Sequence, residues 1–315
     1  MDDIRARLKE IDFGRAMPAD TSPDLTVFYH HATLQQVCAL RAYLLEREAR
    51  GRLDSTDQWI RMVAINRLTG HSPGFFSGYT LPPNQAVSVE AQRKINEARR
   101  QIPPPRDIAA IISKKSSSLL ADGAPPGHPP AFLTTGPAYA TPEIRGIEAA
   151  LIVTSPPFLD IVDYEGDNWL RCWFAGIDAK SVAIARYMDV RAWEGFVRQC
   201  FHEFANILRP GALVAFEVSE VRGGKILLER HVASAVAGLP FEVIGVMLNQ
   251  QKFTKTANCW GVANNRSGRT PIESCWLNSG EKGRPDRRRI IVAPCCVSAL
   301  GWRLRGKARS AAVPV

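Results

Sequence analysis

The residues best suited to chemistry in this chain of 315 residues form a Thr-Ser-Pro-Pro-Phe segment, residues 154–158. The segment directly follows an apolar run, residues 147–153, which is typical of a buried parallel strand. Because proline has no N–H and a fixed φ, Pro156 and Pro157 predict that this strand ends in a stiff loop. Open α/β sheets bind their ligands at the carboxyl ends of their strands, so this loop is a candidate site.

The loop offers two fixed hydrogen-bond acceptors beside an aromatic ring. The hydroxyl group of Ser155 and the carbonyl group of Pro156 are adjacent in the sequence and suit an exocyclic NH₂ group. Phe158 adds a flat face on which a nucleobase can stack, and Pro157 stiffens the loop. On these residues alone, a strand-terminal turn without chemistry is an equally good interpretation.

The segment resembles the catalytic motif of the DNA amino-methyltransferases, which is Asp/Asn/Ser-Pro-Pro-Tyr/Phe, and its Thr-Ser-Pro-Pro form favours the cytosine-N4 enzymes. The resemblance implies that Ser155, Pro156, Pro157 and Phe158 form the catalytic loop. In such enzymes the polar side chain and the first proline carbonyl hold the target amino group, and the aromatic ring stacks on the flipped-out base. The amino nitrogen then attacks the methyl group of S-adenosylmethionine directly, so the resemblance implies neither a metal nor a covalent enzyme intermediate.

The resemblance extends over residues 25–275. It includes an Asp-Tyr pair and a following helix, residues 168–176, with the sequence NWLRCWFAG. Upstream, the stretches at residues 28–34, 67–76 and 81–85 are also similar to one bacterial branch of these enzymes. From the resemblance we expect four more residues in the base or substrate pocket: Thr154, Asp163, Tyr164 and Trp169.

The charge of the chain favours a polyanionic partner. Its 40 basic and 31 acidic residues give a formal net charge of +9. DNA is therefore the expected partner, and the expected DNA contacts lie in a polar loop near the cleft: Lys252, Lys255, Arg266 and Arg269. A solvated hairpin is the alternative interpretation of that loop.

The fold class predicted from the patterns is α/β, a partial Rossmann-like methyltransferase sheet with a mainly helical N-terminal region. Residues 1–121 are expected to be helical, with helices near residues 33–50, 57–68, 89–100 and 106–120, and to form a possible target-recognition region. Residues 122–146 are expected to be a connector, since six prolines fall between residues 122 and 142. Residues 147–279 are expected to form the catalytic half of the α/β domain, with strands at 147–153, 212–218, 241–248 and 272–277. An amphipathic helix with Trp193 on its apolar side is expected at residues 192–208, and residues 209–211 are expected to form the turn that ends it. Residues 280–315 are expected to be a disordered basic tail.

The cofactor-binding part of the family pattern is missing. S-adenosylmethionine enzymes hold the cofactor with a Gly-x-Gly turn between a strand and a helix, and this chain contains no Gly-x-Gly. Cofactor-binding residues are therefore unknown, and a second subunit that carries the cofactor half is one explanation. A truncated or non-catalytic DNA-binding remnant is another. A protein glutamine methyltransferase, which holds an amide with an Asn-Pro-Pro-Tyr loop, is a third and less favoured interpretation because Ser155 replaces the Asn.

The remaining composition is that of a cytoplasmic protein without a metal site or membrane contact. The seven cysteines include no Cys-x-x-Cys pair, and no histidine has metal-ligand spacing with a carboxylate. The start of the chain lacks the pattern of a signal peptide. The longest apolar stretch, residues 232–248, is interrupted by Pro240 and Glu242.

Overall fold

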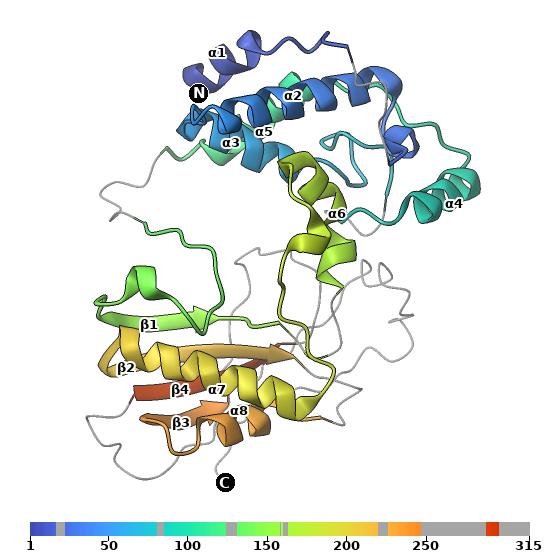
Figure 1. The fold of residues 1–315 in the computed structure, drawn as a ribbon. Helices are drawn as coiled ribbons and strands as arrows, with labels where there is room; N and C mark the ends of the chain where they lie inside the picture. Colours follow the sequence, from blue (N-terminus) through green and yellow to red (C-terminus); the bar gives the residue numbers. More distant parts are fainter. Residues whose placement is uncertain are drawn as a thin grey trace. The chain divides into compact units, whose positions relative to one another are not determined.

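The computed structural model shows two compact units, each with its own hydrophobic core (Figure 1). The helical unit comprises residues 1–130 and 163–184, and the α/β unit comprises residues 131–162 and 185–315. The structure describes residues 1–16, 23–80, 85–123, 131–157, 159, 163–219, 226–246 and 288–295.

Helices make up most of the helical unit, as the periodicity of its apolar residues predicts. They are α1 (Asp2–Glu10), α2 (His31–Ala49), α3 (Ser55–Ile65), α4 (Val89–Arg99), α5 (Ile108–Leu119) and α6 (Tyr164–Ala175), with two 3-10 helices, η1 (Leu25–Val27) and η3 (Ala179–Ser181). The helices expected near residues 33–50, 57–68, 89–100 and 106–120 are thereby confirmed. Their buried faces form one core with large side chains such as Phe28, Leu40 and Phe76.

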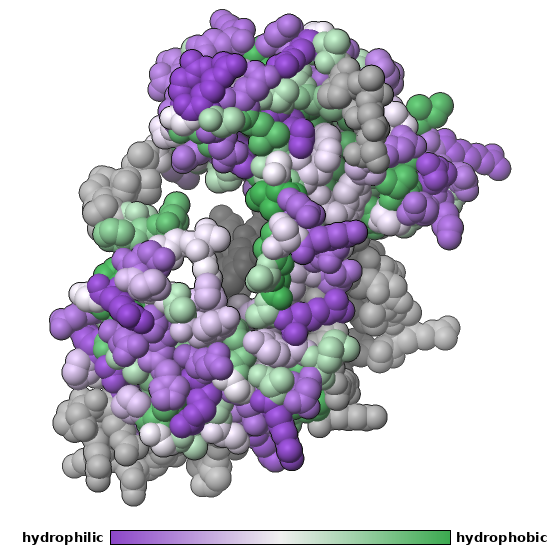
Figure 2. Space-filling model, viewed as in Figure 1, coloured by the Kyte–Doolittle hydropathy of each residue, from purple (hydrophilic) through white to green (hydrophobic). Residues whose placement is uncertain are grey.

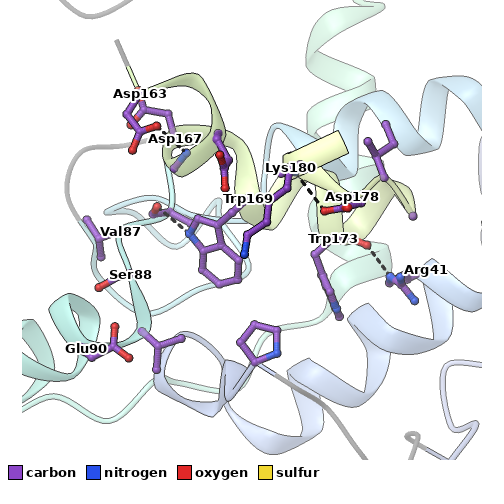
Figure 3. A pocket seen from close by; sticks show the side chains of 18 residues that line it. Arg41, Val87, Ser88, Glu90, Asp163, Asp167, Trp169, Trp173, Asp178 and Lys180 are labelled. Atoms are coloured by element: carbon purple, nitrogen blue, oxygen red, sulfur yellow. Dashed lines mark hydrogen bonds between the residues drawn. The ribbon is translucent and has the colours of Figure 1, made fainter. Parts of the chain in front are cut away.

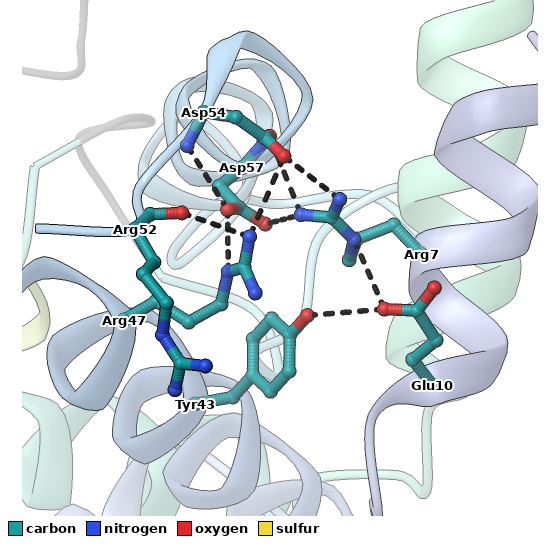
Figure 4. Close-up of polar contacts among 7 residues, drawn as sticks. All are labelled: Arg7, Glu10, Tyr43, Arg47, Arg52, Asp54 and Asp57. Carbon is teal, nitrogen blue, oxygen red and sulfur yellow. Dashed lines mark hydrogen bonds and ion pairs between the residues drawn. The ribbon is translucent and has the colours of Figure 1, made fainter. Parts of the chain in front are cut away.

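Three of these helices are joined by a buried carboxylate (Figure 4). Asp57 on α3 is fully buried, and it forms ion pairs with Arg7 of α1 and Arg47 of α2, the latter over 2.6 Å from Nε to Oδ2. Asp54 and Asp57 also form a reciprocal capping box at the start of α3. Since a buried charge is costly unless it is paired, this network fixes how α1, α2 and α3 pack.

Helix α6 packs in the helical unit, although the sequence patterns assigned it to the catalytic α/β domain. Leu170 and Phe174 are buried in the helical core. The indole N–H of Trp169 donates to the carbonyl oxygen of Ala86 over 3.0 Å, and Arg41 Nε donates to the carbonyl oxygen of Trp173 over 2.7 Å. The expected division at residue 147 was wrong for this segment, because the apolar face of α6 complements α2 and α3.

The α/β unit contains a sheet in which all neighbouring strands are parallel. Its strands are β1 (Ala149–Thr154), β2 (Leu208–Ser219), β3 (Phe241–Val246) and β4 (Arg288–Cys295), in the order β1-β2-β4-β3. Helices α7 (Val190–Ile207) and α8 (Leu228–Val236) lie together on one face of this sheet (Figure 1). The unit also contains the short 3-10 helix η2 (Pro142–Ile144). The mixed α/β class is therefore confirmed.

The covered face of the sheet holds the core of the α/β unit. Val214, Phe216 and Val218 alternate along β2 and are buried against α7 and α8. The intervening Leu213 is 38% exposed, and its partner on β1, Leu151, is 54% exposed. Among the described residues, this sheet is thus covered more completely on one face than on the other.

Two strand predictions need correction. The turn expected at residues 209–211 lies inside β2, where the register against β1 shifts between Ala149 and Leu151 and Gly211 has a φ of +74°. Proline cannot donate to a neighbouring strand, so Pro210 produces an irregularity here rather than the end of an element. The fourth strand is β4, which lies within the segment expected to be a disordered tail, because its run Ile290-Ile291-Val292 has strand character. The strand expected at 272–277 lies outside the described residues.

Candidate functional site

The Ser-Pro-Pro loop lies at the carboxyl end of β1, as its sequence predicts. Strand β1 ends at Thr154, and residues 155–157 have no regular structure. Ser155 is exposed, Pro156 is buried and Pro157 is half-buried. The prolines therefore anchor the loop while the serine hydroxyl group faces solvent.

A tryptophan from α7 holds this loop in place. The side chain of Trp193 is fully buried, and its indole N–H donates a hydrogen bond to the carbonyl oxygen of Pro157 over 3.1 Å. Helix α7 is itself fixed at its start, where the Asp189 carboxylate accepts a hydrogen bond from the backbone N–H of Ala192. The apolar pattern identified Trp193 only as a core residue. The signal that could have revealed more is that a buried indole N–H needs an acceptor.

The acceptors assigned to the target amino group have no partner within the described part of the chain. No hydrogen bond joins Ser155 Oγ or the Pro156 carbonyl oxygen to another described residue. The carbonyl group of Pro157, by contrast, is occupied by Trp193. Within the described residues, the exposed Ser155 hydroxyl group and the carbonyl group of the buried Pro156 thus remain without a hydrogen-bond partner. Phe158 lies outside the described residues.

The other expected pocket residues belong to the helical unit, which contains a groove of about 1030 Å³. Asp163 and Trp169 line this groove together with Trp173, and α4 contributes its first residues (Figure 3). Tyr164 begins α6, is half-buried, and is not among the lining residues. The structure therefore brings Asp163 and Trp169 together, and it places Thr154 and the Ser-Pro-Pro loop in the other unit.

Local structure explains why Asp163 and Trp169 lie where they do. Asp163 is the N-cap of α6, and its carboxylate accepts a hydrogen bond from the backbone N–H of Gly166 over 3.2 Å. Trp169 Nε1 is occupied by the carbonyl oxygen of Ala86, and its ring packs against Phe28 with the ring centroids 6.0 Å apart. Each residue thus has a structural role and also lines the groove.

The groove is acidic although the chain as a whole is basic. Its lining includes five carboxylates, from Glu90, Asp163, Glu165, Asp167 and Asp178, and two cationic side chains, those of Arg41 and Lys180.

Two pKa shifts accompany this arrangement. Burial raises the pKa of Asp167, and the nearby charge of Asp163 raises it further, while Arg171 opposes the shift. Burial also lowers the pKa of Arg41, whose guanidinium lies 4.9 Å from the centroid of the Trp173 ring. A site with carboxylates and indole rings suits a flat ligand that carries amino groups, and it disfavours a phosphate group.

Several expected residues cannot be compared with the structure. Lys252, Lys255, Arg266 and Arg269 lie outside the described residues. Among the described residues there is no group of three or more His, Cys, Asp or Glu side chains placed to bind a metal ion. The described helices also include none with the length and apolar character needed to cross a membrane.

Comparison with family models, with curated proteins and with solved structures gave no match. The functional assignment therefore depends on the residues and geometry of the chain itself.

Proposed function

We propose that this chain carries the catalytic and base-recognition part of an S-adenosylmethionine-dependent DNA amino-methyltransferase, with cytosine N4 as the favoured target atom. The observation that carries the proposal is the loop after β1. Ser155 Oγ and the Pro156 carbonyl oxygen are without partners among the described residues, and Trp193 holds the next carbonyl group in the loop.

The role of this loop is to hold and orient an amino group. The two N–H bonds of an exocyclic amine would donate to Ser155 Oγ and to the Pro156 carbonyl oxygen, which directs the nitrogen lone pair away from the loop. When bound, S-adenosylmethionine supplies the methyl group. Alignment of this kind is worth about 7–11 kcal/mol of a reaction barrier. The target base must first leave the duplex, which costs a few kcal/mol.

The residues that line the groove of the helical unit are a separate observation that supports a nucleobase as the ligand. Trp169 and Trp173 provide aromatic rings for stacking, and Asp163 and Asp167 provide acceptors for amino groups. Because the lining is acidic, we propose that the groove receives a base rather than a stretch of phosphate backbone.

We further propose that a second chain supplies the cofactor-binding half. The sequence contains no Gly-x-Gly turn, and β1 is an outermost strand of the described sheet. Two apolar side chains of β1 are well exposed, Leu151 at 54% and Val153 at 73%. Parallel sheets normally cover both faces, so an apolar outer strand of this kind suits pairing with a further strand and its helix.

The test is methyl transfer by the full chain, alone and mixed with a candidate partner that contains a strand followed by Gly-x-Gly. The substrates are tritiated S-adenosylmethionine and genomic DNA from a methylation-deficient host. We expect transfer by the mixture, and digestion of the product followed by mass spectrometry should give N4-methylcytosine. If the product is N6-methyladenine instead, the enzyme class stands and the target atom is adenine N6.

Transfer by neither the chain nor the mixture on any DNA, with DNA binding intact, would support the second candidate. This candidate is a non-catalytic DNA-binding remnant, and the missing Gly-x-Gly turn favours it. Transfer to a glutamine-containing peptide instead of DNA would also overturn the proposal.

A further inference from the structure

The turn that follows α4 is built as a rigid and exposed element with a basic and apolar surface. We define the α4 tip as Arg99, Arg100, Gln101 and Ile102. Residues 89–106, which contain α4 and this tip, include five basic and two acidic residues. Helix α4 buries only Gln92. Hydrophilic side chains project from α4 at the edge of the helical unit (Figure 2).

Three contacts fix the α4 tip to the loop around Gly78 and Tyr79. The guanidinium of Arg99 stacks over the Tyr79 ring, 3.6 Å from its centroid. Gln101 Nε2 donates to the Tyr79 carbonyl oxygen over 2.8 Å and to Asn96 Oδ1 over 2.7 Å. Pro103, which directly follows the tip, packs so close to Gly78 that a Cβ there would lie 3.3 Å from the proline Cα. A partner would therefore meet a preorganised surface, which lowers the entropic cost of binding.

The backbone of Arg100 is unusual. Its φ is +48°, and among the described residues it is the one non-glycine residue with positive φ. The left-handed conformation at a helix C-terminus is normally left to glycine or asparagine. The dipole of α4 favours a positive charge in its last turn, which accounts for Arg99. The dipole does not account for an arginine at the strained C-cap position, where glycine would be more stable.

The neighbouring Ile102 is 86% exposed, and it precedes three consecutive prolines, residues 103–105. Neither Arg99 nor Arg100 forms an ion pair with another described residue. The tip thus combines two arginines that have no ion-pair partner among the described residues, of which Arg99 stacks on Tyr79, with one exposed aliphatic side chain. Proteins that bind the minor groove of DNA combine these features, because arginine enters the groove and an aliphatic side chain wedges between base pairs.

We propose that the α4 tip binds duplex DNA through Arg99 and Arg100 and inserts Ile102 into the minor groove. The inference deepens the proposed function and depends on it for the identity of the partner. It assigns DNA contact to a surface that is separate from the acidic groove, at the opposite end of α4 from the residues that line that groove.

The test uses fluorescence anisotropy of the full chain with a labelled duplex of about 30 base pairs, titrated at several salt concentrations. Arg100→Gly removes one charge and relieves the backbone strain. We expect it to raise Tm by a few degrees and to weaken binding by about 5- to 10-fold near 0.1 M salt, with a loss of about 1 from the salt slope. A purely structural role for Arg100 predicts the rise in Tm without the loss of affinity.

Ile102→Ser tests the apolar insertion separately from the charge contribution of the two arginines. We expect weaker binding with an unchanged salt slope, since an apolar contact releases no counterions. The matched control is Lys9→Ala on α1, which removes one exposed charge at a part of the helical unit that is distant from α4 in Figure 1. We expect it to bind as the unchanged chain does.

Binding of Arg100→Gly and Ile102→Ser at the level of the Lys9→Ala control would overturn the inference while leaving the proposed function standing. A chain that binds no duplex even at about 50 mM salt would overturn both. If these two variants lose binding to a protein while their DNA binding is unchanged, the α4 tip is a protein-binding surface and the inference is overturned. If Arg100→Gly and Ile102→Ser weaken DNA binding as expected but no methyl transfer is detected, the proposed function is overturned and the inference stands.

Discussion

Trp193 Nε1 lies 3.1 Å from the carbonyl oxygen of Pro157, and this hydrogen bond joins helix α7 to the loop that ends β1. The bond is buried at its tryptophan end, so it is not exchanged easily for a bond to water. Since the following carbonyl group is held, the peptide units of Ser155 and Pro156 have little freedom to turn. We therefore regard Trp193 as a positioning residue for the proposed catalytic loop.

The first prediction concerns this bond. Trp193→Phe keeps an aromatic ring in the core and removes the N–H donor, so we expect a large fall in kcat for methyl transfer with DNA affinity unchanged. The stability loss should be about 1 kcal/mol, because the half-buried Pro157 loses the hydrogen bond to its carbonyl group. Trp59→Phe is the matched control, since Trp59 donates to Ser116 Oγ over 3.0 Å in the helical unit. Equal kinetic effects of both substitutions would argue against positioning by Trp193.

The second prediction concerns the exposed hydroxyl group of the loop. We expect Ser155→Ala to lower methyl transfer by about 10²-fold or more, as for the loss of one oriented donor or acceptor in an active site. DNA binding and Tm should change little because Ser155 is exposed and has no partner among the described residues. Transfer assays, anisotropy and thermal unfolding check these three outcomes. A parallel loss of transfer and DNA binding would contradict the assigned role.

The third prediction concerns acid stability. Glu203 on α7 is buried, and hydrogen bonds from the backbone N–H of Thr141, from Asn206 and from the Thr141 hydroxyl group lower its pKa. Because the folded-state pKa is depressed, this stabilisation is present above the ordinary value of 4.5 and is lost as the pH falls through the folded-state pKa. Urea unfolding between about pH 3 and 6 should show this dependence, and Glu203→Gln should flatten it.

A control for this pH effect is Glu143→Gln in η2, where the side chain is exposed. We expect the unchanged pH dependence in this variant. The same dependence in Glu203→Gln would show that other carboxylates cause it.

The fourth prediction concerns the buried carboxylate that joins α1, α2 and α3. Asp57→Ala leaves Arg7 and Arg47 without their shared buried partner, so we expect a loss of about 3–5 kcal/mol in the free energy of unfolding. Glu46→Ala removes the more exposed ion pair with Arg15 and should cost about 1 kcal/mol or less. Chemical denaturation followed by circular dichroism measures both. Similar losses would mean that burial does not set the strength of the Asp57 network.

Periodicity predicted the elements better than it predicted their partners. Helices α2, α3, α4 and α5 and strands β1 and β3 fall close to the expected residues, because each carries its apolar pattern locally. Helix α6 has an equally clear pattern, but its packing partners lie more than a hundred positions away. Arg41 and Arg61, for example, donate hydrogen bonds to carbonyl oxygens near its end. No local pattern could have assigned α6 to the helical unit.

The candidate site was likewise predictable only where the signal is local in the sequence. The Ser-Pro-Pro loop follows from proline chemistry alone, so its position after β1 could be expected. The role of Trp193 could not, because 36 positions separate it from Pro157 and its sequence pattern is that of an ordinary core residue. Strand β4 was missed because the basic residues from Lys282 to Arg289, the last two of which begin the strand, dominated the interpretation of this segment. The same segment also contains Ile290, Ile291 and Val292.

The discontinuity of the helical unit has a consequence for synthesis and for fragment design. Its last α-helix, α6, is made only after the ribosome has passed the whole of β1, since residues 131–162 belong to the other unit. Until Leu170 and Phe174 have been synthesised, the earlier helices of this unit therefore keep part of their apolar surface exposed to solvent. A fragment that ends at residue 130 would remain permanently in that unfinished state, and expression of it should yield aggregated or protease-sensitive material.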